Sequence, residues 1–413
     1  MNGLMFLFFC YCISAEKAFA FSVGGSFADS VVVESMNFII ADSISLHGML
    51  YLPRHSSPKG ILVDIDRPDV ILPKFDFVNN SDSAGYSKKM VTHLIRSGIG
   101  VFFLAPRVPY NHENRMAIIS SLEYKAQTLE TIAEDAKTAC LFIKKDARFT
   151  NTPVGVSGGS AMGLPAVMAA VQEKRISFVL LSSTPSTNNM DDAEYSYDRG
   201  SMNYMYLRAL FSELWSMVKD TTFIYNGLKY SNTEQKSIED QFTECAWDCF
   251  KKINRTIIAK QSDYDTIQKK ATALMKGSFQ WGKTGDWKPV KGLGTETVKT
   301  PDELIDLLMC TWHKPIDISF LRWNPEEWYP QLTCPVLFLF AENDKIIDLE
   351  GSVANIRRIK EQYTKSNFSI HIIKWCGHSF DYYYMKKGEG MRRKAISDKP
   401  FNELSNWFIS HFN

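Results

Sequence analysis

The sequence predicts an α/β fold in which a mostly parallel sheet is flanked by helices on both faces. Short β-branched runs alternate with amphipathic helices from about residue 37 to 187. The alternation is lost over 184–327 and returns over 328–413. Strands that are separated by helices form parallel βαβ units, whose sheets are covered on both faces. A chain of 413 residues exceeds one typical domain, so we expect one α/β core with a large insertion.

Each predicted element of the first half follows from a local pattern. The apolar positions Leu129, Ile132 and Ala136, for example, recur at helical spacing. The predicted strands are Phe38–Ala41, His47–Leu52, Gly60–Ile65, Gly98–Ala105, Val154–Val156 and Ile176–Ser182. The predicted helices are Ser87–Ser97, Tyr124–Lys145 and Ser160–Val171.

The remaining elements divide into a mainly helical middle segment and a second α/β stretch. The expected helices of the middle segment are Tyr204–Val218, Thr233–Asn254, Asp263–Lys276 and Pro301–Cys310. After it we expect the strands Pro335–Ala341 and Ser369–Trp375 and the helices Gly351–Thr364 and Pro400–Phe412. The core therefore consists of 21–183 and 328–413, and the helical insertion of 184–327.

Residues 1–20 are expected to be a secretory signal peptide. Leu4–Ala15 is almost entirely apolar, and Ala18, Phe19 and Ala20 have the small-x-small spacing of a cleavage site. The apolar run is too short to span a bilayer, which needs about 20 residues of helix. No Lys or Arg precedes it, so an uncleaved anchor or a wrongly assigned start stays an alternative. We expect a secreted or periplasmic protein with no stable membrane span after cleavage.

Charge and cysteine content exclude several classes of protein. Lys and Arg number 47 against 46 Asp and Glu, a balance that disfavours nucleic-acid partners. Six cysteines remain after the signal, and they permit disulfides without dictating them. Cys245 and Cys249 have no matching pair nearby, so we interpret them as buried thiols on a helix. No metal-ligand cluster, phosphate loop or dinucleotide motif occurs, so no cofactor is expected.

The segment Gly155-Val156-Ser157-Gly158-Gly159 has the G-x-S-x-G spacing of a nucleophile elbow. A β-branched strand precedes it and a helix of small residues follows it. In that setting a serine occupies a strained turn at the carboxyl edge of the sheet. The alternatives are a glycine-rich turn that only packs, or one that binds phosphate at the helix N-terminus. Ser157 is therefore the predicted nucleophile.

An acid and a base for this serine follow the two predicted strands of the second half. Asp344 comes after Pro335–Ala341, and His378 comes after Ser369–Trp375. The carboxyl ends of parallel strands form one edge, where ligands of open α/β sheets bind. A serine hydroxyl needs a base, and the base needs an orienting group. Ser157, Asp344 and His378 are thus predicted to form a triad.

These motifs make the chain similar to the α/β-hydrolases. The resemblance rests on the GVSGG elbow, on PVLFLFAENDKIID at the acid strand and on CGHSF at the histidine loop, and it covers 37–187 and 328–412. It implies that Ser157 is the nucleophile, that His378 is the general base and acid, and that Asp344 orients the imidazole. It also implies that the Gly158 amide binds the oxyanion and that the insertion forms a cap.

Two of these roles, the acid and the nucleophile, have alternative candidates nearby in the sequence. Asp348 is a second candidate for the acid if the turn after the strand is longer than expected. Ser160 lies close to the elbow, but Gly158 before it and Met162 after it do not complete the spacing, so it is interpreted as a helix-start residue. His112 follows a predicted strand and is a candidate for substrate binding.

The second oxyanion donor departs from the family pattern. Members usually carry a His-Gly-x segment after the strand that here is Gly60–Ile65, but this chain reads Asp-Arg-Pro-Asp at 66–69. Pro68 would occupy the donor position, and proline has no N–H. Three explanations remain open. The donor is the backbone amide of Arg67, or it is a side chain such as that of Tyr86 or Arg67, or the protein is a weak enzyme. Arg67 is our candidate.

A serine nucleophile predicts acyl transfer through an acyl-enzyme intermediate. We expect a carboxylesterase-like serine hydrolase with a small-molecule ester or amide substrate. The many aromatic residues of the insertion form either its own core or an apolar substrate pocket. A peptidase, an acyltransferase and a non-catalytic binding protein on the same fold are the alternatives. The sequence does not indicate an oligomeric state.

Overall fold

Two compact units make up the protein in the computed structural model. It describes residues 27–39, 45–65, 85–107, 127–198, 211–212, 214–215, 222–234, 236–261, 263–280, 300–312, 315–363, 367–385 and 392–412. Of these described residues, one unit, the insertion, contains those from Asn188 to Trp323, and the other, the core, contains those before Asn188 and from Asn324 onward. The expected bounds, 184 and 327, each differ from these by four residues.

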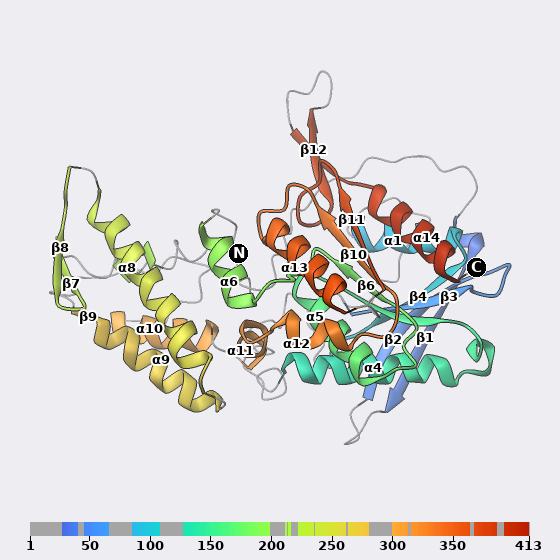
Figure 1. Ribbon diagram of the computed structural model, residues 1–413, viewed down its shortest axis with the longest axis horizontal. Helices are drawn as coiled ribbons and strands as arrows, with labels where there is room; N and C mark the ends of the chain where they lie inside the picture. Colours follow the sequence, from blue (N-terminus) through green and yellow to red (C-terminus); the bar gives the residue numbers. More distant parts are fainter. Residues whose placement is uncertain are drawn as a thin grey trace. The chain divides into compact units, whose positions relative to one another are not determined.

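The core is built on an eight-stranded sheet with the order β1-β2-β4-β3-β5-β6-β10-β11 (Figure 1). Its strands are β1 Val31–Ile39, β2 Ser45–Pro53, β3 Gly60–Asp64, β4 Ile99–Leu104, β5 Val154–Gly159, β6 Val179–Ser182, β10 Val336–Ala341 and β11 Phe368–Ile373. β2 pairs antiparallel with β1 and β4, and the other pairs are parallel. The predicted fold class, a mostly parallel sheet flanked by helices, is confirmed.

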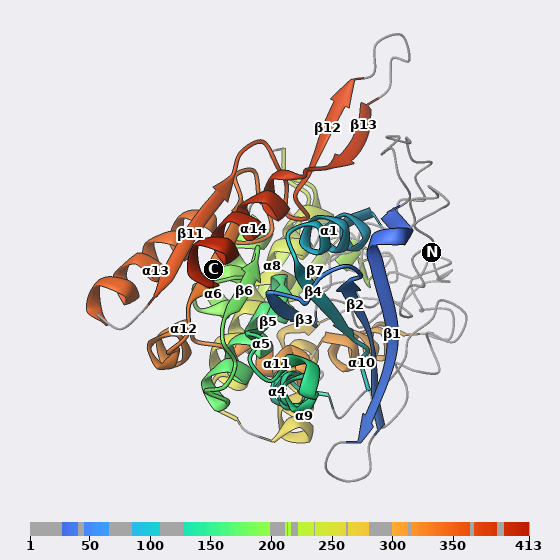
Figure 2. The ribbon, with the colours of Figure 1, turned by 90° about the vertical axis from the view of Figure 1, so that its right-hand side faces the viewer.

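Helices cover both faces of this sheet, as Figure 2 shows. On one side lie α1 Gly85–Arg96 and α14 Lys399–Phe412, and on the other lie α4 Leu129–Lys145 and α5 Gly163–Gln172. Apolar side chains of α1 and α14, such as Leu94 and Phe408, share a buried cluster with Leu180 of β6. Since the central strands are apolar on both faces, they need both helical layers.

The parallel strands bring distant parts of the sequence to one edge. Gly159 of β5 pairs with Ser182 of β6, which in turn pairs with Leu339 of β10. β11 continues the parallel order beside β10. The residues that follow β5, β6, β10 and β11 therefore lie along one carboxyl edge. The loops that carry the predicted residues Asp344 and His378 lie at this edge.

Three further elements belong to the core. The helices α12 Pro325–Trp328 and α13 Leu349–Gln362 lie before and after β10 in the chain. A two-stranded hairpin, β12 Asp381–Met385 and β13 Arg392–Ile396, follows the histidine loop. It extends away from the sheet in both views (Figures 1 and 2). The sequence did not predict this hairpin.

The insertion has a hydrophobic core of its own. Its helices are α6 Asn189–Asp198, α8 Ile238–Ile253, α9 Tyr264–Ser278, α10 Pro301–Trp312 and α11 Pro315–Leu321, and its strands are β7 Thr222–Tyr225, β8 Leu228–Ser231 and β9 Phe279–Gln280. The small sheet was not predicted. The Phe223, Phe242 and Phe279 rings contact one another, so much of the aromatic content fills this core. Among the described helices, none is long and apolar enough to cross a membrane.

Candidate active site

Ser157, the predicted nucleophile, lies inside β5 and not at its end. It is 3% exposed, and its Oγ donates a hydrogen bond of 2.9 Å to Oδ1 of Asp64. Asp64 is the last residue of β3 and lies directly opposite Ser157 in the parallel register. The Ser157 carbonyl also accepts a bond from the amide of Ile65. Ser157 is therefore a strand residue tied to its neighbour, three residues before the turn.

The sharp strand-to-helix turn is formed by Ser160. It is the first residue after β5, is half-buried, and has a φ of 51°. A 3-10 turn, Ser160–Met162, leads from it directly into α5. Non-glycine residues rarely adopt a positive φ, and such strain concentrates at functional sites. These are the features of a nucleophile elbow, and the structure places them at Ser160.

The spacing of the glycines explains why the sequence predicts the turn at Ser157, whereas the structure has it at Ser160. A Cβ at Gly158 would lie 2.2 Å from the Met162 carbonyl oxygen, so Gly158 is the residue that permits the tight reversal. A Cβ at Gly155 would instead meet the Phe178 ring at 2.4 Å, which is a packing constraint within the sheet. The G-x-S-x-G match around Ser157 therefore reflects strand packing. A motif match centred on Ser160 would need glycine at position 162, and the chain has Met162 there.

Asp344 and His378 form the predicted pair. His378 Nδ1 lies 2.7 Å from Asp344 Oδ2, and the Asp344 side chain is fully buried. Oδ1 of Asp344 accepts hydrogen bonds from the backbone amides of Ile346 and Ile347, at 2.8 and 3.3 Å. These amides fix the carboxylate, and the carboxylate fixes the imidazole. Because Nδ1 is bonded to the carboxylate, Nε2 is the nitrogen that can act as a base.

The alternative acid and another histidine have structural roles. Asp348 is the N-cap of α13, because its Oδ1 accepts a bond of 3.0 Å from the amide of Gly351. His371 on β11 lies 2.7 Å from Glu403 of α14, in a surface pair. His112 lies outside the described residues.

Of the two predicted oxyanion residues, the structure describes Gly158 but not Arg67. Gly158 lies within the β5 ladder, opposite Leu181 of β6, and not after the turn. Arg67 lies outside the described residues, as does the side chain of Tyr86. In a nucleophile elbow the amide of the residue after the nucleophile binds the oxyanion. With the turn at Ser160, that amide belongs to Ala161.

Ser160, Asp344 and His378 all follow strands of one parallel set. Ser160 directly follows β5, while Asp344 and His378 lie in the loops after β10 and β11. The backbone links these two loops, because the Asn343 amide donates to the Cys376 carbonyl at 2.9 Å. The loop that carries the histidine has positive φ values at Trp375 and Phe380. The core unit alone thus supplies a serine, a histidine and an acid at one edge.

The comparisons with known proteins find similar solved structures only. The chain matches no protein-family model and no curated protein. Among solved structures it is similar to an esterase of Pyrococcus furiosus, at 10% identity over 98% of this chain and 100% of that one, with a TM-score of 0.47. A hypothetical protein of Pseudomonas aeruginosa is 14% identical over 97% of this chain and 98% of its own, with a TM-score of 0.43.

A third similar structure is a cold-adapted esterase from an Arctic intertidal metagenomic library. It is 10% identical over 93% of this chain and 95% of its own, with a TM-score of 0.43. At such identities and scores, the likeness carries no argument about activity. The arrangement of residues in the core must support any functional conclusion.

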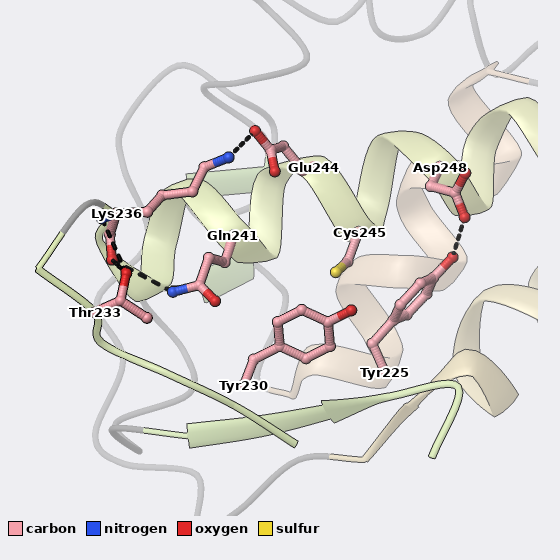
Figure 3. A pocket seen from close by; sticks show the side chains of 8 residues that line it. All are labelled: Tyr225, Tyr230, Thr233, Lys236, Gln241, Glu244, Cys245 and Asp248. Atoms are coloured by element: carbon pink, nitrogen blue, oxygen red, sulfur yellow. Dashed lines mark hydrogen bonds and ion pairs between the residues drawn. The ribbon is translucent and has the colours of Figure 1, made fainter. Parts of the chain in front are cut away.

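The insertion contains a hollow of about 420 Å³ that lies apart from these residues in the chain (Figure 3). Its lining comes from β7, β8, α8 and the loop before α8: Tyr225, Tyr230, Thr233, Lys236, Gln241, Glu244, Cys245 and Asp248. The Tyr225 hydroxyl donates to Asp248 at 2.9 Å, and Lys236 pairs with Glu244. Burial, followed by the bond to Asp248, raises the pKa of Tyr225. Four of the lining side chains therefore bond in pairs to one another.

The described part of the chain contains no group of three or more His, Cys, Asp or Glu side chains that could hold a metal ion. The described cysteines, Cys140, Cys245, Cys249, Cys334 and Cys376, are free thiols. Cys245 and Cys249 are buried on α8, as the sequence indicated.

Proposed function

We propose that the protein is a serine hydrolase whose nucleophile is Ser160, with His378 as general base and Asp344 as its orienting acid. The observation that supports Ser160 most strongly is its φ of 51° at the junction of β5 and α5. Ser157 lacks this conformation and is held by Asp64. A nucleophile must present its Oγ above the sheet edge, and a buried strand serine does not.

The proposed reaction is acyl transfer in two steps. His378 Nε2 takes the proton of Ser160 Oγ while Oγ attacks the substrate carbonyl, and the imidazolium then protonates the leaving alcohol. Water attacks the resulting acyl-enzyme, gives a proton to Nε2, and releases the acid as Oγ regains that proton. The Asp344 carboxylate stabilises the imidazolium in both steps. In this proposal the Ala161 amide binds the oxyanion.

Esters are the proposed substrate class. A neutral chain with a Ser-His-Asp set supports an ester of a small or apolar acid more than a polyanionic substrate. Peptidase and acyltransferase activities use the same residues, so they are outcomes of the test. Hydrolysis of p-nitrophenyl esters that exceeds both aminoacyl-anilide cleavage and transfer to an added alcohol would support esterase activity.

Fluorophosphonate labelling of four proteins tests the residue assignment: wild type, Ser160→Ala, Ser157→Ala and His378→Ala. We expect wild type and Ser157→Ala to label, and the other two to lose labelling with an activity loss of about a thousandfold or more. Circular dichroism controls for folding.

If folded Ser160→Ala still labels and folded Ser157→Ala does not, the nucleophile is Ser157 and the proposal for Ser160 is wrong. Wild type that neither labels nor releases p-nitrophenol would favour a non-catalytic binding protein.

A further inference from the structure

Large apolar side chains are exposed in the segment that contains the histidine loop. Of the eight large hydrophobic residues that are exposed in the described part of the chain, three lie between positions 372 and 382. They are Ile372 in β11, Trp375 in the loop and Tyr382 in β12. Trp375 is 73% exposed. Tryptophan is mostly buried in folded domains, and a cluster of exposed apolar side chains marks an interaction site.

The backbone holds Trp375 in this exposed position. Its φ is 67°, a left-handed conformation that is unfavourable for a residue with a Cβ. The Trp375 amide donates a hydrogen bond of 3.0 Å to Oε2 of Glu342. The next residue, Cys376, is bonded through its carbonyl to the amide of Asn343. Both bonds lead to the loop after β10, so the exposed indole is carried by a fixed backbone.

The histidine loop closes at the base of the β12–β13 hairpin, and this base is anchored to the core. The Gly377 amide donates to the carbonyl of Asp381, the first residue of β12, at 2.8 Å. Lys89 Nζ of α1 donates to the carbonyl of Ile396, the last residue of β13, at 2.8 Å. Beyond the base, the two strands pair with each other and extend away from the large sheet (Figures 1 and 2). A two-stranded hairpin by itself is only marginally stable in water, so a partner would stabilise this one.

Both faces of the hairpin combine aromatic and basic positions. The register places Tyr383 opposite Lys394. It places Tyr384, the next residue, opposite Arg393. Opposite residues share a face and successive residues alternate between faces, so neither face has the wholly apolar sequence that packs on a hydrophobic core. The sequence over 381–396 contains five Lys or Arg against two Asp or Glu, whereas the whole chain is nearly balanced.

We propose that the β12–β13 hairpin and Trp375 dock the protein on the surface of an anionic lipid bilayer. Aromatic and basic side chains occur together at the headgroup level of membranes, where rings contact the acyl boundary and cations are attracted to anionic lipids. The basic excess of the hairpin supplies the attraction, and Trp375 and Tyr382 supply the apolar contact. A nucleic acid would also attract the charge, but the exposed Ile372 favours a partner with an apolar interior.

Co-sedimentation of the full-length protein with lipid vesicles tests this docking. Vesicles of phosphatidylcholine alone are compared with vesicles that also contain phosphatidylglycerol. We expect binding to the anionic vesicles only, and loss of that binding at about 1 M salt, where the Debye length falls to about 3 Å. No substrate is present, so the outcome is independent of the proposed hydrolase activity.

A pair of charge variants locates the electrostatic part of the surface. Arg392→Gln/Arg393→Gln removes two charges from β13. It should weaken binding about thirtyfold, since each basic residue near an anionic surface contributes about fivefold. Lys269→Gln/Lys270→Gln removes two exposed charges from α9 and is the matched control. This control should bind as wild type does.

A second pair of variants tests the apolar contact. Trp375→Ala removes the exposed ring and should weaken binding about tenfold or more. Ile39→Ala is its control, because Ile39 is 74% exposed and lies on β1, at the other end of the strand order. It should leave binding unchanged. Circular dichroism checks that all four variants are folded.

Several outcomes would overturn the proposal. Binding through the apolar run Leu4–Ala15 would persist on phosphatidylcholine alone and in every variant. Equal loss of binding in the hairpin variant and the α9 variant would show that the total charge matters and the hairpin does not. Wild type that ignores anionic vesicles but binds a DNA duplex in a salt-dependent way would assign the surface to a nucleic acid. Wild type that binds neither would show that this surface does not dock on lipid.

Discussion

At the scale of single residues, the two serines near the elbow differ in what their backbones allow. Ser157 has a strand conformation, and its hydroxyl serves as a donor to the buried Asp64 carboxylate. Ser160 has a left-handed conformation that few non-glycine residues adopt. Because a buried carboxylate must be hydrogen-bonded, Ser157 stabilises the sheet. These differences are the reason that Ser160 is the proposed nucleophile.

Ser157→Ala should therefore reduce stability without abolishing catalysis. It removes one donor from a buried carboxylate, so we expect the free energy of unfolding to fall by about 1–3 kcal/mol. Urea denaturation followed by tryptophan fluorescence measures this change. Ser157→Thr, which keeps the hydroxyl, is the matched control and should recover part of the loss. Equal stability of Ser157→Ala and wild type would show that this hydrogen bond contributes nothing.

At the scale of elements, pairing with β6 determines where β5 ends. The strand is bonded to β3 as far as Ser157 and to β6 as far as Gly159. Its helix neighbours α4 and α5 present small side chains toward the sheet, including the fully buried Cys140. The buried faces of α4 and α8 together hold three of the described cysteines. Their thiols are part of the packing.

The thiols of the native protein are accordingly expected to resist alkylation. Burial raises the pKa of Cys140 and of Cys249, and it raises the pKa of Cys334 to about 11. Each raised pKa lowers the fraction of reactive thiolate near neutral pH. Iodoacetamide labelling read by mass spectrometry should be slow in the folded protein and fast in urea. Among these three, Cys334 is the only partly exposed one and should react first; rapid native labelling of Cys249 would contradict its buried position.

At the scale of the whole molecule, the core and the insertion each have a hydrophobic cluster of their own. Phe338 of β10 is fully buried in the core, and Phe242 of α8 is fully buried in the insertion. The chain passes between the units near Thr187 and again near Trp323. Two separate clusters allow the units to lose structure separately.

Truncation of a central side chain should affect only the unit that contains it. Phe242→Ala and Phe338→Ala each remove a buried ring, and each is expected to destabilise its unit by about 3–5 kcal/mol. Hydrogen-exchange mass spectrometry should show lost protection in the insertion for Phe242→Ala and in the core for Phe338→Ala. Uniform loss of protection across both units in either variant would show that they unfold as one.

Local sequence patterns account for most of the α/β core. Periodicity and composition placed its sheet strands and flanking helices, because both depend on local patterns of apolar residues. Asp344 and His378 were identified because each follows an apolar strand in a polar loop. Pairing between short strands is less visible: neither the β12–β13 hairpin nor the small sheet of the insertion was predicted. Their pairing depends on contacts that a short segment does not specify.

Strand pairing in the folded protein sets which serine occupies the turn. Sequence spacing favoured Ser157, since glycines flank it at the positions of the motif. β5 continues beyond it because β6 pairs with Gly158 and Gly159, whereas the pairing with β3 ends at Ser157. Asp64, 93 residues earlier in the chain, binds the Ser157 hydroxyl across the sheet. A strand boundary set by long-range pairing cannot be read from local spacing, and here it moves the proposed nucleophile to Ser160.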